Sequence, residues 1–228
     1  MTGFFHVYQF LGPATLMPLA AYGWWRHYDG DWNLAAVALL VPVIHAYIVP
    51  GIGTNVLGMW AFNTRLKLGK FRPHHGFVFG SATALIALMC IGAPSPQLSA
   101  GTVLSTALLI GAVLLAVNWV YDALALKSGV LEVYNQPWAN GAGPWAISGD
   151  YVIWFFGVFG VIYGAGLRLA ESVLLVSSIP LNSVALTALI VAATLIIPTL
   201  GYIATSWLRH GHSGCRPRTQ RTMEARTS

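Results

Sequence analysis

Charge is the main shortage in this sequence. Only 8% of the 228 residues are Asp, Glu, Lys or Arg, while 56% are hydrophobic and the mean hydropathy is +0.65. Soluble domains devote about a quarter of their residues to these four charged types. So few charges cannot cover a water-exposed surface, which excludes an ordinary soluble domain. The composition predicts an integral membrane protein.

Cysteine and the common cofactor motifs are also scarce. Cys90 lies in an apolar stretch and Cys215 in a polar segment near the C-terminus, so no sensible disulfide and no Cys-x-x-Cys metal site can form. The sequence also lacks a phosphate loop, a nucleotide fingerprint, a zinc motif and a nucleophile elbow. We therefore expect no metal site and no cofactor.

Long apolar runs are plentiful. About 20 helical residues cross the roughly 30 Å hydrocarbon core of a bilayer, and six stretches approach or exceed that length: 4–25, 34–60, 76–93, 102–126, 151–169 and 183–208. The first stretch lacks the basic start and the cleavage site of a signal peptide, so we expect a retained helix. The predicted fold is an all-α, polytopic membrane bundle of about six helices, with five to seven as the range.

The basic residues predict the orientation of this bundle. All of the 12 Lys and Arg residues except Arg26 and Arg168 fall on the side that holds both termini. Cytoplasmic loops retain positive charge, so both termini should be cytoplasmic in a multi-pass protein of the inner cell membrane. The net charge of +5 is then explained by anionic lipid headgroups, and no nucleic-acid partner is expected.

The chain divides into one transmembrane domain, residues 1–208, and a basic tail, residues 209–228, which we expect to be disordered. Within the domain, residues 34–93 and 102–169 are weakly alike. Each contains a membrane helix followed by an aromatic-Asn pair, Phe62-Asn63 or Tyr134-Asn135. The unequal spacing leaves a chance match as good an explanation as an internal repeat.

Three of the seven acidic residues gather in one region. Asp122, Glu132 and Asp150 lie around a long Gly-rich loop, and carboxylates near a membrane interior are functional candidates because they are costly to place there. Asp122 shares a helix face with Asn118. Structural explanations remain open: Asp122 could pair with Lys127, Glu132 could be solvated, and Asp150 could cap the next helix.

Aromatic side chains accompany these acids. Their faces stabilise cations, which suits a carbocation intermediate, although Trp and Tyr also form ordinary belts at membrane interfaces. The combination with three acids favours a site. The catalytic candidates are Asp150, Asp122 and Glu132, and the predicted substrate-binding residues are Trp60, Asn55, Asn118, Trp119, Tyr134, Asn135, Trp154 and Phe155.

The segments "YDALALKSGVLEVYN" and "GDYVIWFFGVF" together resemble the small integral-membrane lycopene cyclases. The Asp122-Ala123 pair matches an Asp-Ala pair of that family, and the Tyr134-Asn135 pair matches its aromatic-Asn pair. Asp150 matches the second acid of its acidic pair, while Gly149 occupies the place of the first acid. The resemblance covers about 40 residues.

This resemblance implies a redox-neutral cyclisation of a hydrophobic isoprenoid that enters from the bilayer. An acid protonates a terminal alkene, an internal double bond captures the cation, and a base removes a proton, so carboxylates and aromatic faces would lower the barrier. The missing first acid is compatible with another terpenoid, such as a prenylated aromatic. It is equally compatible with a partner subunit in a homo- or hetero-oligomer.

A different class of function remains open. A non-catalytic membrane subunit could bind a quinone, a pigment or a haem within a larger complex. His6 and His45 lie in the first two apolar stretches, and paired imidazoles on adjacent helices can hold a haem. A transporter is disfavoured because the acids collect toward one face of the bundle.

Overall fold

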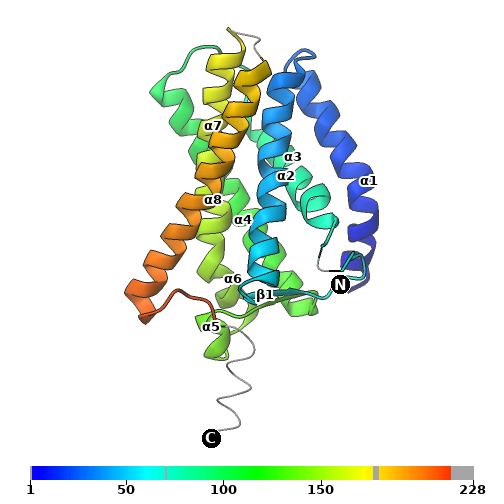
Figure 1. The fold of residues 1–228 in the computed structure, drawn as a ribbon, viewed down its shortest axis with the longest axis vertical. Helices are drawn as coiled ribbons and strands as arrows, with labels where there is room; N and C mark the ends of the chain where they lie inside the picture. Colours follow the sequence, from blue (N-terminus) through cyan, green and yellow to red (C-terminus); the bar gives the residue numbers. More distant parts are fainter. Residues whose placement is uncertain (1, 70, 177–179, 217–228) are drawn as a thin grey trace, which may run out of the picture.

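The structure is a computed structural model that describes residues 2–69, 71–176 and 180–216. Long helices run side by side along its longest axis, and both ends of the described chain lie toward the same end of the bundle (Figure 1). The longer helices are α1 (Thr2–His27), α2 (Trp32–Asn55), α3 (Ser81–Ile91), α4 (Ala100–Ser128), α7 (Phe159–Leu174) and α8 (Pro180–His210).

Shorter elements complete the bundle. The π-helix η1 (His75–Gly80) leads into α3, while α6 (Pro144–Val152) and the π-helix η2 (Ile153–Val158) lead into α7. Two short strands, β1 (Trp60–Phe62) and β2 (Leu131–Val133), and the one-turn helix α5 (Gln136–Ala139) lie at the end that holds the termini (Figure 1).

The described residues contain four helical segments that are long and apolar enough to cross a membrane. They are Trp32–Asn55, Ala100–Ser128, Pro144–Leu174 and Asn182–His210, and His75–Ile91 is an apolar but shorter segment. By length and composition, the chain therefore has the architecture of a multi-pass membrane protein. The all-α class and the long apolar helices are confirmed.

The helix boundaries follow from local capping chemistry. Asp31 Oδ1 accepts hydrogen bonds from the backbone N–H groups of Asn33 (2.7 Å) and Leu34 (3.3 Å) at the start of α2. Ser99 caps α4 in the same way, and Gly129 ends that helix in the left-handed conformation at φ 75°. The predicted stretch 34–60 is too long, because α2 ends at Asn55 and the apolar sequence continues into β1.

The pairing of β1 with β2 joins the two long loops. The strands are antiparallel, with Trp60 opposite Val133 and Phe62 opposite Leu131. Asn63 extends the contact, because its backbone N–H donates to the carbonyl of Val130 at 2.8 Å. This small sheet brings segments about 70 residues apart in the sequence together beneath the bundle, and it fixes the positions of Trp60 and Phe62.

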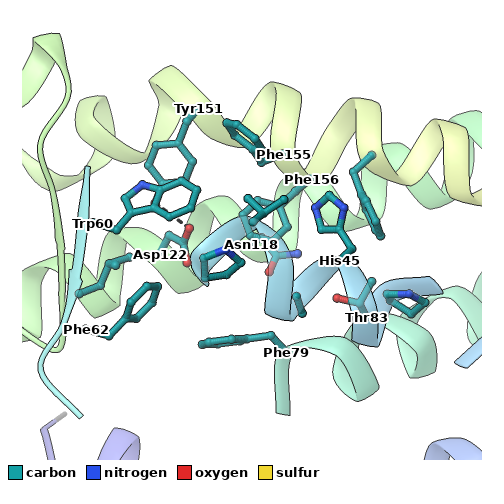
Figure 2. A pocket seen from close by; sticks show the side chains of 16 residues that line it. His45, Trp60, Phe62, Phe79, Thr83, Asn118, Asp122, Tyr151, Phe155 and Phe156 are labelled. Carbon is teal, nitrogen blue, oxygen red and sulfur yellow. Dashed lines mark hydrogen bonds between the residues drawn. The ribbon is translucent and has the colours of Figure 1, made fainter. Parts of the chain in front are cut away.

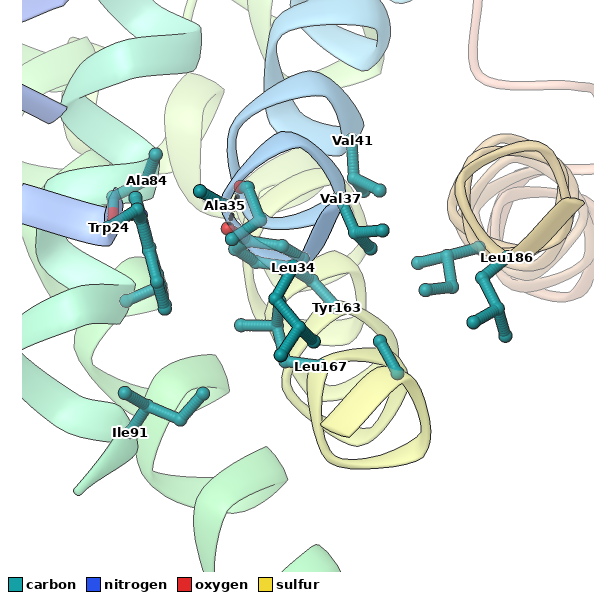
Figure 3. Packing of buried hydrophobic residues seen from close by; sticks show 14 of the residues in the cluster. Trp24, Leu34, Ala35, Val37, Val41, Ala84, Ile91, Tyr163, Leu167 and Leu186 are labelled. Carbon is teal, nitrogen blue, oxygen red and sulfur yellow. Dashed lines mark hydrogen bonds between the residues drawn. The ribbon is translucent and has the colours of Figure 1, made fainter. Parts of the chain in front are cut away.

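One part of the core is a cluster that includes buried residues from α1, α2, α3 and α7 (Figure 3), in the half of the bundle away from the strands (Figure 1). Trp24 of α1 is fully buried and donates through Nε1 to the carbonyl of Ala84 in α3 at 3.0 Å. Tyr163 of α7 donates its hydroxyl proton to the carbonyl of Ala38 in α2. Leu34 lies at the centre of this packing, so α2 is held between α1 and α7.

A buried ion pair links neighbouring helices in the same half of the bundle. Arg168 Nη1 and Glu171 Oε2 of α7 are 2.6 Å apart, and both side chains are at most 7% exposed. Arg168 also donates to the Thr106 hydroxyl of α4 at 3.0 Å, to the carbonyl of Ile91 at the end of α3, and to the carbonyl of Ala93 in the following turn. Glu171 accepts from the Tyr28 hydroxyl at 3.1 Å. The pair therefore connects α1, α3, α4 and α7.

Glycines allow α4 and α7 to approach closely. A Cβ atom at Gly160 would lie 2.8 Å from the Gly111 Cα, and one at Gly164 would lie 3.0 Å from the Ala107 Cα. Small residues permit this contact between membrane helices, where van der Waals packing replaces the hydrophobic effect as the driving force.

Gly160→Ala is expected to destabilise the bundle, because the added methyl group meets backbone atoms that cannot move aside. The expected loss is about 1–3 kcal/mol of unfolding free energy, measured by thermal unfolding in detergent. Gly101→Ala is the matched control, since its Cβ meets nothing within 4 Å, and it should not lower stability. Equal unfolding temperatures for the two variants would contradict the close contact.

The chain beyond α8 folds back under the strands. The Arg216 backbone N–H donates to the Tyr134 carbonyl at 2.8 Å, and Arg216 Nε donates to Gln136 Oε1 at 2.9 Å. Residues 209–216, which the sequence analysis assigned to a disordered tail, thus include the end of α8 and a segment held by hydrogen bonds. The rest of that predicted tail, residues 217–228, lies outside the described residues.

Candidate functional site

A cavity of about 730 Å³ opens between α2, α4, η2 and the strands (Figure 2). Its walls are mostly aromatic and aliphatic, with a few polar groups. The lining residues are Pro42, His45, Ala46, Val49, Pro50, Trp60, Phe62, Phe79, Thr83, Asn118, Asp122, Leu131, Tyr151, Phe155, Phe156 and Phe159. A mostly apolar wall with a few polar groups is typical of a small-molecule pocket.

Irregular backbone makes room for this cavity. Pro42 and Pro50 lie inside α2 and line the cavity, and a proline in a helix removes one backbone hydrogen bond and bends the helix. On the opposite wall, Phe155 and Phe156 belong to the π-helical segment η2. Widened π-helical turns are frequent at functional sites, and here one turns two aromatic rings toward the cavity (Figure 2).

Asp122 is the carboxylic acid of the cavity. It lies near the end of α4, is 8% exposed, and faces the cavity one turn after Asn118 (Figure 2). The Tyr151 hydroxyl donates to Asp122 Oδ2 at 2.7 Å. The alternative ion pair with Lys127 is not present among the described residues.

Asp150 lies outside the cavity lining and is held by polar partners. Its Oδ2 accepts from Asn135 Nδ2 at 3.1 Å and from the Tyr202 hydroxyl at 3.0 Å, and Arg209 Nη2 lies 3.4 Å from Oδ1. The proposed capping role is wrong, because α6 begins at Pro144 and Asp150 is inside it. Asp150 instead ties α6 to α8 and to the loop after β2.

Glu132 is also not among the residues that line the cavity. It lies on β2, where its Oε1 accepts from Asn63 Nδ2 at 2.8 Å and its Oε2 accepts from the Tyr134 hydroxyl. These bonds connect the two long loops. The structure therefore brings only Asp122 of the three candidate acids to the cavity wall.

Of the predicted substrate-binding residues, some line the cavity and others do not. Trp60, Asn118 and Phe155 line the cavity. The other five are not in its lining. Asn55 lines a smaller cavity beside Arg72 and His75, and the Trp119 side chain is 43% exposed. Trp154 packs against Gly201 of α8, Tyr134 contacts Trp138, and Asn135 caps α5.

Sequence reasoning missed several residues of the cavity. Phe62 and Phe79 reach it through the strand pairing and through η1, neither of which has a sequence signal. No sequence signal identifies Tyr151 as the partner of Asp122. The buried His45, a haem candidate, lines the cavity with its ring centroid 4.3 Å from that of Phe159. The side chain of His6 lies outside the described residues.

The part of the chain that the structure describes has no group of three or more His, Cys, Asp or Glu residues arranged to hold a metal ion. The polar chemistry of the cavity therefore comes from Asp122, Tyr151, Asn118, His45, Thr83 and Trp60. An acid, a histidine ring and an aromatic wall suit proton transfer to and from an apolar substrate.

Asp150→Asn should mainly affect stability. The amide can still accept from Asn135 and Tyr202, but it loses the charge that faces Arg209, so we expect a loss of about 1–3 kcal/mol of unfolding free energy. Thermal unfolding measures this change, with Tyr202→Phe as a second variant that removes one of the same hydrogen bonds. A normal melting temperature for Asp150→Asn would contradict the structural role.

Comparison with known proteins gives no support for or against a function of this site. No protein-family model, no curated protein and no solved structure matches the chain. The resemblance to the lycopene cyclases consequently stays a prediction that rests on the motif residues. Any conclusion on function depends on the site itself, since a fold does not determine function.

Proposed function

We propose that the chain is a membrane-embedded terpenoid cyclase that closes a ring in an unsaturated isoprenoid, with Asp122 as the acid. The observation that carries this proposal is a buried carboxylic acid, hydrogen-bonded by Tyr151, on the wall of an aromatic cavity between apolar helices. The sequence resemblance points to the same chemistry, and its motifs include both Asp122 and Asp150.

The proposed reaction is redox-neutral. Asp122 transfers its carboxylic proton to one carbon of an alkene, which leaves a tertiary cation on the neighbouring carbon. An electron pair of the same molecule, such as a second double bond, forms the new bond and closes the ring. A proton then leaves the carbon beside the new cation. His45 is the proposed acceptor, since it lines the cavity and its Nδ1 has no hydrogen-bond partner among the described residues.

The aromatic wall supports such an intermediate. Trp60 lies 5.8 Å from Phe155 and 6.3 Å from Tyr151 between ring centroids, so three rings meet beside Asp122 (Figure 2). A ring face stabilises a nearby cation by about 0.5–2 kcal/mol. Because these rings are held in place before the reaction, their stabilisation requires no rearrangement as charge develops.

The proposed topology has six spans and cytoplasmic termini. Both ends of the described chain lie toward one end of the bundle (Figure 1), as an even number of crossings requires. Arg65, Lys67, Arg209 and Arg216 belong to segments near the strands or to the end of α8, which favours that end as the cytoplasmic side. An isoprenoid dissolved in the bilayer would then reach the cavity between helices.

Product analysis tests the proposed function. Purified protein in liposomes would be incubated with lycopene, with a linear prenyl hydrocarbon and with a prenylated hydroquinone, followed by chromatography and mass spectrometry. We expect at least one substrate to give a new product of unchanged mass. Folded wild-type protein that converts none of them, yet co-purifies with a quinone, pigment or haem, would favour the non-catalytic subunit instead.

A further inference from the structure

A second, smaller cavity is also lined by Asp122. It shares Phe62, Phe79, Asp122 and Leu131 with the larger cavity, so the acid lies at the junction of the two. We propose that this smaller cavity binds the hydroxylated aromatic head of the substrate, and that the substrate is a prenylated phenol or hydroquinone. This inference rests on the proposed function, because it identifies the substrate of the same site.

Two side chains that line the smaller cavity, Thr64 and His74, carry buried polar atoms without a hydrogen-bond partner among the described residues. Thr64 Oγ1 is buried, and the ring nitrogens of His74, a residue only 3% exposed, meet no described atom in hydrogen-bond geometry, although the Leu66 backbone lies close to the ring. Both residues line this cavity. A buried polar group without a partner is unfavourable, so the site favours a ligand that supplies hydroxyl groups.

The state of His74 suits such a ligand. Burial, with a smaller contribution from the charge of Arg72, lowers the His74 pKa to about 4. The ring is therefore neutral at pH 7, with one nitrogen able to donate and the other able to accept. A phenolic hydroxyl can both donate and accept, so it can pair with His74 and Thr64 together.

The remaining walls favour a flat ring. Tyr8 and Tyr121 line the cavity with centroids 6.1 Å apart, and Phe79 meets Tyr121 edge-on at 5.7 Å. Aromatic rings pack well in offset or edge-on arrangements at such spacings. With the head ring in this cavity, the prenyl chain passes Asp122 and enters the larger aromatic cavity. A pure hydrocarbon would leave Thr64 and His74 unpaired.

Ligand binding tests this assignment independently of turnover. Geranylhydroquinone and geranylbenzene, which differ only in two hydroxyl groups, would be titrated against purified protein in detergent with tryptophan fluorescence as the readout. Wild type should bind geranylhydroquinone at least tenfold more tightly, and Asp122→Asn should keep this preference. Equal affinities in wild type would overturn the inference, even if the protein cyclises a hydrocarbon.

Two variants test whether Thr64 and His74 cause the preference for geranylhydroquinone over geranylbenzene. Thr64→Val keeps the shape of the side chain and should reduce the preference severalfold, and the double variant with His74→Phe should abolish it while leaving the affinity for geranylbenzene unchanged. Thr54→Val, in the separate cavity beside Arg72, is the control and should bind both ligands like wild type. A preference that survives in folded Thr64→Val and in the double variant would contradict this location. A clear preference without any turnover would count against the proposed function alone.

Discussion

Asp122→Asn is expected to lower the rate of ring closure by about 10²–10⁴-fold, which is the usual contribution of a general acid. The amide keeps the size of the side chain and can still accept from the Tyr151 hydroxyl, so folding should be preserved. Product formation in liposomes, measured per folded protein, gives the rate. The helical content and the melting temperature confirm that the variant is intact.

Two other acids provide the control for this prediction. Glu132→Gln and Asp150→Asn alter acids that lie outside the cavity lining, so each should change the rate by only a few-fold once folded protein is compared. If Asp150→Asn abolishes turnover while Asp122→Asn does not, the acid has been assigned to the wrong residue. The same result would assign the acid to Asp150, the other aspartate that the sequence motif includes.

Arg168→Met is expected to cause the largest loss of stability, about 3–5 kcal/mol, because it leaves Glu171 charged and buried without its partner. The hydrogen bonds of Arg168 to α4 and to the turn after α3 are lost as well. Thermal unfolding in detergent should show a much lower transition temperature. The candidate cavity lies toward the other end of the bundle, so turnover per folded molecule should change little.

The double variant Arg168→Met, Glu171→Leu separates charge from packing. If the unpaired carboxylate causes the loss, removing it should restore a substantial part of the stability, since apolar replacements of a buried pair are often neutral. A double variant that is less stable than Arg168→Met would instead mean that the hydrogen bonds of Glu171 to Tyr28 and to the Ser95 N–H dominate.

The long helices were predictable because their signal is local. Twenty apolar residues in succession require a helix in a bilayer, since the backbone must satisfy its own hydrogen bonds. The end of the second predicted span was not predictable in this way. Residues 56–60 are also mostly apolar, but Gly58 adopts a positive φ of 61° and the chain turns into β1.

The site was only partly predictable, because it depends on pairings across the fold. Asp122 was predictable because an acidic residue in an apolar helix is rare. This signal does not depend on how the helices are arranged. Asp150 has the same rarity, but its partners Tyr202 and Arg209 come from α8, more than 50 residues away. Tyr151 follows Asp150 directly, yet successive helical residues point about 100° apart, and this rotation directs Tyr151 to Asp122.

Reaction in deuterated water tests the central claim most directly, because a ring closure begun by protonation must take one hydrogen from an exchangeable acid. Isolated membranes would be equilibrated in D2O and given the substrate, and the product would be analysed by mass spectrometry. We predict one non-exchangeable deuterium per product from wild type and no product above background from Asp122→Asn. Cyclised product without deuterium, or labelled product from Asp122→Asn at the wild-type rate, would contradict the assignment of Asp122 as the proton donor.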